Sequence, residues 1–382
     1  MTGRGQALLL LAAGALYTGL SLGGRMFYLS AVFVLLALLF SLICVLTARH
    51  ALRISCTVTP EKGVRGDISR LHVKVECSVP VPIAALRLTL YSAGKETEHT
   101  VPLMRGSAEM DEEELLRHVG RFRYGVSRAI VTDMLGLFSL KVSFDDALAD
   151  QLVLPRSFEV EPLHFSQEEE GGVLLRQASE DLSSPEDTRA YRSGDALKRI
   201  HWKLSARKRE LVVRRFETPA PPDTLILLDC SRPVFWTSPA DAGESLRDTL
   251  CETALSVTEM QARSDSPVRV PLYGEQAAEF ISQRGGNTDV LAEMLACQEF
   301  KKGEEFSRIL NLELRRMRRT GATVIVTSRL NADIAEAIKH IRRMGPSARL
   351  YYITYLPDDP MDRPYISQLL RQGVEVCYVT PA

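Results

Sequence analysis

Oxygen-bearing side chains stand in two loops of the chain, each beside a predicted strand or helix. Asp229 and Ser231 follow the apolar run "TLILL", and Thr288 precedes a predicted helix within "RGGNTDV". Because alternate residues of an extended strand point the same way, Asp229 and Ser231 share one side of the strand tip. A carboxylate with two hydroxyls is a hard-oxygen ligand set that suits Mg²⁺. These three residues form the predicted metal site, with Mg²⁺ as the candidate cofactor.

This arrangement resembles the metal-ion-dependent adhesion site of von Willebrand factor A domains, whose first loop reads D-x-S-x-S and whose second loop offers a Thr. Asp229, Ser231 and Thr288 match that pattern. The second serine position holds Pro233, and the third loop, which should offer an Asp, reads "VTSRLNAD" with hydroxyl side chains at residues 327–328. The alternative is a retained fold with a vestigial loop, in which Asp229 and Ser231 cap the following helix.

A dense basic stretch, "RAYRSGDALKRIHWKLSARKRELVVRRFE", covers residues 189–217. It holds ten Lys or Arg residues against three acids, although the whole chain has a net charge of -1. That near-neutral balance argues against a general nucleic-acid binder, which usually carries a strongly basic domain. Nucleic acid is therefore not an expected partner.

Helical periodicity within this stretch predicts an amphipathic element docked on its own protein. Asp195 stands at the expected N-cap, and Leu197, Ile200 and Leu204 fall on one helical face. The basic side chains then form an outer stripe. We expect Trp202 and His201 to be largely buried, and Asp195 to be hydrogen-bonded to backbone or to a nearby Arg.

Catalytic patterns in the same stretch are weak. His201 has no carboxylate at helical spacing, and Ser205 with Lys208 fits S-x-x-K without the S-D-N and K-T-G companions of serine acyl-enzymes. The chain contains neither a Walker loop nor G-x-G-x-x-G. No catalytic residue is predicted, and an enzyme is not the favoured class.

Two uncharged stretches at the amino terminus are each long enough to cross a bilayer as a helix. Twenty residues lie between Arg4 and Arg25, and twenty-three lie between Arg25 and Arg49; about 20 apolar residues span a hydrocarbon core of about 30 Å. The link at residues 23–24 is short, so a tight transmembrane hairpin is predicted over residues 1–49. A cleavable signal peptide is the alternative for the first stretch.

Positive charge flanks the outer ends of this hairpin. Arg4 precedes it, and Arg49 and Arg53 follow it, whereas Arg25 alone stands in the turn. The positive-inside rule predicts that both ends and the bulk of the chain are cytoplasmic. The seven cysteines are scattered without a C-x-x-C motif, which is typical of free thiols in a reducing compartment. The predicted localisation is the cell membrane, with the lipid bilayer as a partner.

The rest of the chain divides by periodicity. Residues 50–165 alternate apolar and polar side chains, which predicts an immunoglobulin-like β-sandwich; residues 110–117 are expected to form a short helix or a loop. Residues 166–222 hold an acidic linker and the basic stretch. Over residues 223–382, apolar runs alternate with helical periods, which predicts a doubly wound α/β domain. The predicted fold class is α+β multidomain.

The basic stretch resembles the signature of the DUF58 family, a domain of unknown function, which runs approximately R-x-Y-x-x-G-D-x-x-R-x-I-H-W-K-x-S-A-R. The matching residues are Arg189, Tyr191, Gly194, Asp195, Arg199, Ile200, His201, Trp202, Lys203, Ser205, Ala206 and Arg207. A second family feature, a D-P-F-G-L-F-like turn, reads "DMLGLF" here. Asp133, Gly136, Leu137 and Phe138 match it, while Met134 and Leu135 depart.

This resemblance implies a function as well as an architecture. Such proteins are typically encoded beside MoxR-type AAA+ ATPases and membrane transglutaminase-like proteins. The resemblance implies a membrane-anchored adaptor of unassigned activity, working with a MoxR-type ATPase and other membrane proteins through a degenerate rim and a von Willebrand A-like domain. Two alternatives remain: a metal-dependent hydrolase using the same rim, and docking of Arg199, Lys203 and residues 207–209 on anionic lipid headgroups.

Overall fold

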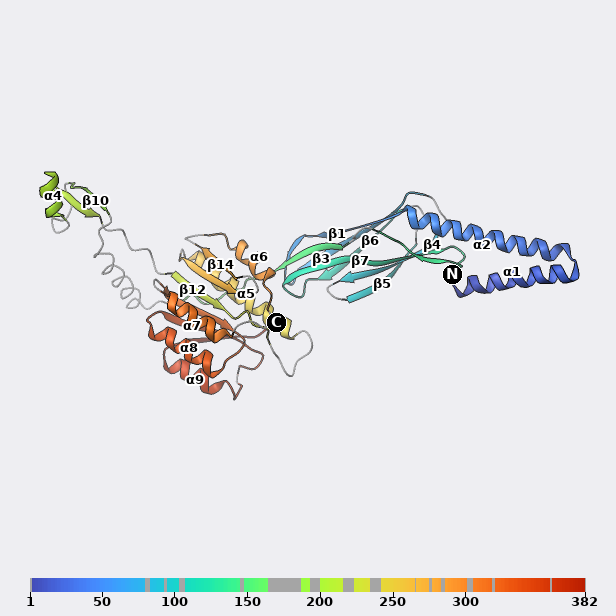
Figure 1. The fold of residues 1–382 in the computed structure, drawn as a ribbon. Helices are drawn as coiled ribbons and strands as arrows, with labels where there is room; N and C mark the ends of the chain where they lie inside the picture. The colour runs from blue at the N-terminus through green and yellow to red at the C-terminus, as the bar shows by residue number, and fades with distance from the viewer. Residues whose placement is uncertain are drawn as a thin grey trace. The chain divides into compact units, whose positions relative to one another are not determined.

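The chain folds into two compact units in a computed structural model, residues 1–154 and residues 155–382 (Figure 1). The described residues are 2–79, 83–92, 95–102, 107–144, 148–163, 187–192, 200–215, 223–233, 242–264, 266–274, 277–282, 286–300, 305–317, 320–357 and 359–381. The expected positions of Gly194, Asp195, Leu197 and Arg199 lie outside these ranges.

Two apolar helices open the first unit, α1 (Gly3–Leu22) and α2 (Arg25–Ala51). The buried residues of α1 are Gly5, Ala12 and Gly19, which are small and spaced seven residues apart. Because small side chains leave room for the neighbouring backbone, they let α1 and α2 approach each other closely. A Cβ at Gly19 would lie 3.3 Å from that of Phe27. Both helices are long and apolar enough to cross a membrane, as predicted.

Two β-sheets follow in the same unit. The first has the order β1 (Leu52–Thr59), β3 (Ile68–Cys77), β6 (Ser107–Leu115); the second has the order β2 (Lys62–Val64), β9 (Leu148–Leu154), β7 (Gly120–Asp133), β4 (Ile83–Ser92), β5 (Lys95–Val101), with β8 (Ser139–Lys141) paired to β7. Alternate residues of both sheets point into one shared core. It includes Val58, Leu71, Val73, Val75, Leu86, Leu88, Leu90, Val126 and Val131, and Val45 and Ala48 of α2.

Strand β6 corrects the expectation of a short helix or loop at residues 110–117. Its acidic side chains alternate along one face and stand opposite basic side chains of β3. Glu113 pairs with Arg70 at 2.9 Å, and Asp111 lies 2.6 Å from the ring of His72. These cross-strand partners favour a strand, and they could not be assigned without knowing the register.

A six-stranded sheet dominates the second unit, in the order β14-β13-β12-β15-β16-β17. The parallel strands are β12 (Asp223–Leu228), β13 (Val268–Tyr273), β15 (Thr320–Thr327), β16 (Ser347–Ile353) and β17 (Glu375–Val379). The edge strand β14 (Ala277–Ser282) is antiparallel to β13. The first strand, β12, lies inside the sheet, so the chain adds strands to both sides of it. The predicted alternation of buried strands and helices is confirmed, and β14 was not foreseen.

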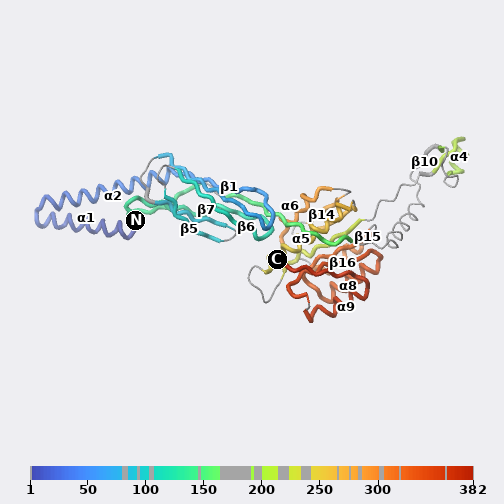
Figure 2. Tube along the Cα trace, turned by 180° about the vertical axis from the view of Figure 1, so that it is seen from behind, coloured from blue at the N-terminus to red at the C-terminus, as the bar shows by residue number. Residues whose placement is uncertain are grey.

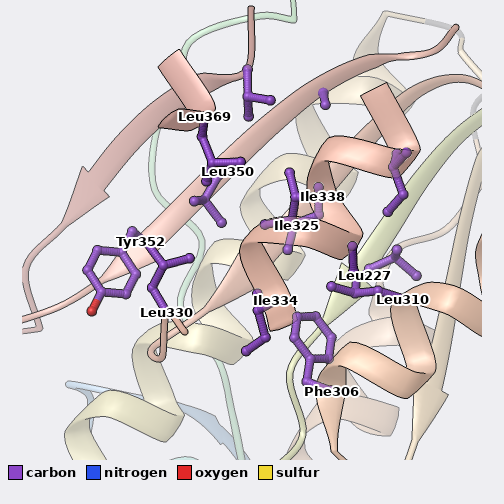
Figure 3. Packing of buried hydrophobic residues seen from close by; sticks show 14 of the residues in the cluster. Leu227, Phe306, Leu310, Ile325, Leu330, Ile334, Ile338, Leu350, Tyr352 and Leu369 are labelled. Atoms are coloured by element: carbon purple, nitrogen blue, oxygen red, sulfur yellow. The ribbon is translucent and has the colours of Figure 1, made fainter. Parts of the chain in front are cut away.

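Helices cover both faces of this sheet. The helices are α5 (Ala242–Arg263), α6 (Asp289–Cys297), α7 (Phe306–Arg316), α8 (Ala332–Arg343) and α9 (Arg363–Arg371). Leu227, Ile325 and Leu350 pack against α7, α8 and α9 (Figure 3); Figure 2 shows α8 and α9 next to each other beside β16. The fully buried neighbours Ile226 and Val324 alternate to the opposite face, where α5 contacts the central strands.

Candidate functional site

The carboxyl end of β12 carries Asp229, the first predicted metal ligand. Its backbone N–H still donates to the carbonyl of Val326 at 2.9 Å, so Asp229 continues the pairing between β12 and β15. These two strands are where the order of the sheet reverses, the position at which open α/β sheets bind ligands. Asp229 is 1% exposed. We refer to Asp229, Ser231, Thr327 and Arg329 as the Asp229 rim.

The Asp229 carboxylate accepts hydrogen bonds from Ser231, Thr327 and Arg329. Ser231 donates its backbone N–H to Oδ1 at 3.1 Å and its hydroxyl to the same oxygen. Thr327 donates its hydroxyl to Oδ2 at 2.8 Å. Nη2 of Arg329 lies 3.3 Å from Oδ1 and 3.4 Å from Oδ2, and it also donates to the Ser231 hydroxyl. A guanidinium therefore occupies the space in front of the carboxylate.

The loop after β15 presents Arg329 in this position. The Thr327 hydroxyl accepts from the Arg329 backbone N–H at 3.1 Å and lies 3.0 Å from the Arg329 carbonyl, which forms a tight local turn. The same hydroxyl bonds to Asp229, so it fixes both the loop and the carboxylate. Sequence reasoning placed Thr327 and Ser328 in this loop but missed Arg329. The sequence did contain a signal for this contact, because a basic residue stands in the loop where an Asp was expected.

Thr288 does not join the Asp229 rim. Strand β14 runs back across the sheet, and its last residue, Ser282, pairs with Val268, the first residue of β13. The chain has therefore returned to the amino-terminal edge of the parallel strands before it reaches Thr288. There Thr288 lines a surface hollow near the end of α5, with Glu259, Ala262, Arg263 and Gly286. The predicted grouping of Asp229, Ser231 and Thr288 is not found.

These residues do not fit a divalent cation. A metal at the Asp229 rim would face the guanidinium of Arg329, and it would lack Thr288 and any carboxylate from the third loop. Pro233 offers no side-chain oxygen. Across the part of the chain that the structure describes, no group of three or more His, Cys, Asp or Glu side chains could hold a metal ion. No chemical step is therefore assigned to a metal at the Asp229 rim.

The signature residues form a small module of their own. Strands β10 (Asp187–Ala190) and β11 (Val212–Arg215) pair antiparallel, and Arg189 lies opposite Val213. Tyr191 extends the pairing by donating its N–H to the carbonyl of Leu211 at 2.8 Å. The short helix α4 (Trp202–Lys208) packs beside β11. Ile200 bridges to Val213 and is buried, so it belongs to the strand pairing rather than to the helix.

His201 and Ser205 have structural roles in this module. The Nδ1 of His201 accepts from the backbone N–H of Leu204 at 3.2 Å and caps α4, the role expected of Asp195. Ser205, which is buried, donates to the His201 carbonyl at 3.0 Å and accepts from the Val212 N–H at 2.9 Å. The Ser205 side chain therefore connects α4 to β11, whereas the His201 side chain caps α4 and the His201 backbone N–H donates to the Val212 carbonyl at 2.8 Å. The two side chains are not arranged as a nucleophile and its base.

Trp202 corrects the expectation of burial, because its side chain is 63% exposed. The expectation assumed one helix that included Ile200, whereas α4 starts at Trp202 and its described inward contacts come from Ser205. His201 is half-buried. Exposed basic side chains accompany Trp202 on α4 and its end, and we refer to them together as the tryptophan face: Trp202, Lys203, Arg207, Lys208 and Arg209.

The described residues define a multidomain α+β protein with two apolar amino-terminal helices and a self-contained carboxylate–guanidinium contact on its α/β sheet. Residues 187–345 match the model of the family described as Protein of unknown function DUF58. Residues 187–345 thus carry a DUF58 domain, as the signature predicted. The matched range includes the signature module and the whole Asp229 rim. No match was found among curated proteins.

Several solved structures show a remote likeness. The CARDB domain of a Pyrococcus furiosus protein, solved in complex with di-metal ions, is 15% identical, with 27% of this chain and 91% of that chain covered and a TM-score of 0.22. Cwp6 from Clostridium difficile is 8% identical, with 86% and 53% covered and a TM-score of 0.21. Spo0M, a sporulation control protein from Bacillus subtilis, is 13% identical, with 37% and 58% covered and a TM-score of 0.16.

Proposed function

We propose that this protein is a membrane-anchored adaptor that binds other proteins and has no catalytic centre at the Asp229 rim. Helices α1 and α2 supply the anchor. The observation that carries the proposal is the contact of Arg329 with Asp229 and Ser231. A metal-dependent hydrolase would need these oxygens free for a cation and its water. The internal ion pair therefore favours the adaptor over the hydrolase.

The finer fold assignments belong to the same proposal. We infer a von Willebrand A-like domain over residues 223–382, supported by the central first strand, the antiparallel edge strand β14 and Asp229 at the end of β12. We infer an immunoglobulin-like sandwich in the first unit, supported by two sheets around one core. The positive charges of Arg4, Arg49 and Arg53 support a cytoplasmic location for both units.

The proposed partner is a MoxR-type AAA+ ATPase, as the family resemblance implies. The tryptophan face supplies the contact, because exposed Trp and Arg side chains are the types that most often carry binding energy in protein interfaces. Its Lys and Arg side chains complement an acidic surface on the partner. Trp202 would insert at the centre, with the basic side chains around it.

Co-purification tests this adaptor function. The full chain is solubilised in detergent and mixed with a MoxR-type ATPase from the same organism, with and without ATP. We expect capture by the native chain and loss of capture by Trp202→Ala with Lys203→Ala. The control is Met361→Ala with Arg371→Ala, which removes an 81% exposed apolar side chain and an exposed basic one elsewhere in the second unit. Equal capture by native chain and both variants would contradict the proposal.

Anionic lipid is the second candidate partner of the tryptophan face, because Trp and basic side chains also favour membrane surfaces. A Trp236→Phe chain in nanodiscs leaves Trp202 as the single fluorescent tryptophan. Lipid docking predicts a blue shift of its emission as anionic lipid is added, and reversal of that shift by salt. Emission independent of lipid charge would exclude this candidate and leave the protein partner.

A further inference from the structure

The turn between β7 and β8 is bonded to both apolar helices. At the start of α1, the hydroxyl of Thr2 donates to the carbonyl of Gly136 at 2.6 Å, and its backbone N–H donates to the carbonyl of Leu137 at 2.9 Å. Within α2, the hydroxyl of Ser41 donates to Oδ2 of Asp133 at 2.6 Å. Both partners of this last bond are buried. The turn is therefore fixed against the helical hairpin at a defined level.

That level coincides with one end of the apolar surface of the hairpin. Thr2 is the N-cap of α1, which spans about 30 Å at a rise of about 1.5 Å per residue. This length equals the hydrocarbon thickness of a typical bilayer, about 30 Å. On α2, large apolar side chains are exposed from Met26 as far as Leu46, five positions beyond Ser41. The turn thus lies beside the end of a continuous apolar band.

The tip of the turn is itself apolar and exposed. Met134 is 72% exposed and Leu135 is 57% exposed, whereas Leu137 points inward at 3%. The backbone bends back at Gly136, whose φ of +67° is accessible to glycine, and the Gly136 N–H donates to the Asp133 carbonyl at 2.9 Å. The two apolar side chains therefore project from the first unit where the hairpin enters its apolar band.

Polar groups around the tip are arranged for a lipid boundary. The Asp133 carboxylate accepts from the backbone N–H groups of Leu135 at 3.1 Å and Phe138 at 2.7 Å, which reduces the cost of moving this backbone out of water. The guanidinium of Arg4 lies beside the turn, 3.7 Å from where a Cβ of Gly136 would stand. A cation at this level suits lipid phosphates.

We propose that Met134 and Leu135 insert into the boundary between headgroups and acyl chains of the leaflet where α1 begins. The β7–β8 turn is then a third membrane contact, besides α1 and α2, and it fixes the β domain against the lipid surface. This inference rests on the proposed membrane anchor. The occupant is lipid, because the exposed apolar tip is bonded directly to the two helices that would stand in the bilayer.

Single-tryptophan reporters test this insertion. Trp202→Phe and Trp236→Phe together remove both native tryptophans from the full chain. Met134→Trp then reports on the turn, Phe33→Trp reports on an exposed position within the apolar band of α2, and Ile68→Trp reports on a 60% exposed apolar position of the β domain. Ile68 lies nine residues along β3 from Cys77, which pairs with Leu52 next to α2; that is about 30 Å at ~3.3 Å per residue.

Each variant is reconstituted into nanodiscs of native-like lipid and of lipid with brominated acyl chains. We expect bromine to quench Phe33→Trp and Met134→Trp, and to leave Ile68→Trp unquenched. For Met134→Trp, bromine near the headgroup end of the chain should quench most, as for side chains buried about 5–10 Å into the interface. Leu135→Trp should behave like Met134→Trp.

Quenching of Phe33→Trp with no quenching of Met134→Trp or Leu135→Trp would overturn the insertion and leave the membrane anchor intact. If Phe33→Trp is also unquenched, the proposed anchor itself fails. The replaced side chains at 33, 68, 134 and 135 are all exposed, so each variant is expected to keep the fold.

Discussion

Arg329 and Asp229 lie on neighbouring strand ends of one sheet, with Nη2 of the guanidinium 3.3 Å and 3.4 Å from the two carboxylate oxygens. The Asp229 side chain is almost fully buried, while the Arg329 side chain is 39% exposed. A buried carboxylate needs a positive partner or strong donors to remain charged. Arg329, Thr327 and Ser231 supply them from within the protein, at the sheet edge where open α/β sheets bind ligands.

Removal of Arg329 should destabilise the second unit. Arg329→Ala leaves the Asp229 carboxylate buried with only hydroxyl and amide donors, and we expect a loss of about 1–3 kcal/mol. That corresponds to a fall of several degrees in the unfolding temperature, followed by calorimetry on the detergent-solubilised chain. Arg343→Ala, an exposed Arg of α8, is the matched control and should change little. Adding Asp229→Asn to Arg329→Ala should recover part of the loss; no recovery would contradict the pairing.

Divalent cations should not stabilise the native chain. The guanidinium holds the position that a cation would need, so the unfolding temperature should be the same with Mg²⁺, with Mn²⁺ and with chelator. Arg329→Ser removes the guanidinium from the oxygens of Asp229 and Ser231. The unfolding temperature of this variant should therefore rise when Mn²⁺ is added. A rise in the native chain that is abolished by Asp229→Asn would show a metal site and would revive the hydrolase.

Cysteine reactivity should follow burial. Burial, and secondarily the charge of Asp229, raises the pKa of the Cys230 thiol to about 12, and burial raises the pKa of Cys251 well above its ordinary value. A raised pKa lowers the fraction of reactive thiolate at neutral pH. In the folded chain, iodoacetamide should label the exposed Cys297 first, as peptide mass spectrometry can measure. Rapid labelling of Cys230 in native conditions would contradict the closed packing beneath the Asp229 rim.

The buried Glu313 should make the second unit sensitive to alkaline pH. Burial and the hydrogen bond from Tyr273 to Glu313, 2.5 Å, raise the pKa of the Tyr273 phenol to about 12. The folded state therefore favours the neutral phenol. Its contribution to stability is present below the unfolded pKa of about 10, and it is lost as pH rises through about 12. Phenolate absorbance of the native chain minus that of Tyr273→Phe gives this titration directly.

Glu313→Gln provides the control for that titration. It removes the carboxylate that accepts from Tyr273 and from Arg269 at 2.7 Å, while burial of the phenol remains. The pKa of Tyr273 should fall toward the ordinary value without reaching it. An unchanged titration would show that burial alone holds the phenol neutral.

Sequence periodicity predicted most elements of the second unit, because buried parallel strands are continuous apolar runs with helical periods between them. Strand β14 escaped because its side chains are mostly exposed and carry little apolar pattern. The predicted helix at the signature merged two different elements, since Ile200 pairs with a strand and α4 begins two residues later. Helical periodicity alone does not distinguish a strand residue such as Ile200 from the residues of the short helix that follows it.

Only part of the Asp229 rim could be predicted from the sequence. Asp229 and Ser231 were found because they end an apolar run, and strand ends define the ligand edge of such sheets. Thr288 was misplaced because an antiparallel strand reverses the chain to the other edge, which spacing does not reveal. Arg329 was missed because its long side chain reaches a residue of another loop. That contact depends on which strands are neighbours, and the order of strands appears only in three dimensions.

The bonds between Thr2 and the β7–β8 turn also have a consequence for biosynthesis. They join residues separated by 134 and 135 positions, so the cap of α1 cannot be completed until the ribosome has passed Leu137. In the same way, Ser41 and Asp133 are separated by 92 positions, so their hydrogen bond cannot form until Asp133 has been synthesised. The hairpin is therefore made first with its cap open, and folding of the β domain closes it. A substitution in the turn would delay maturation of the hairpin after its insertion, rather than insertion itself.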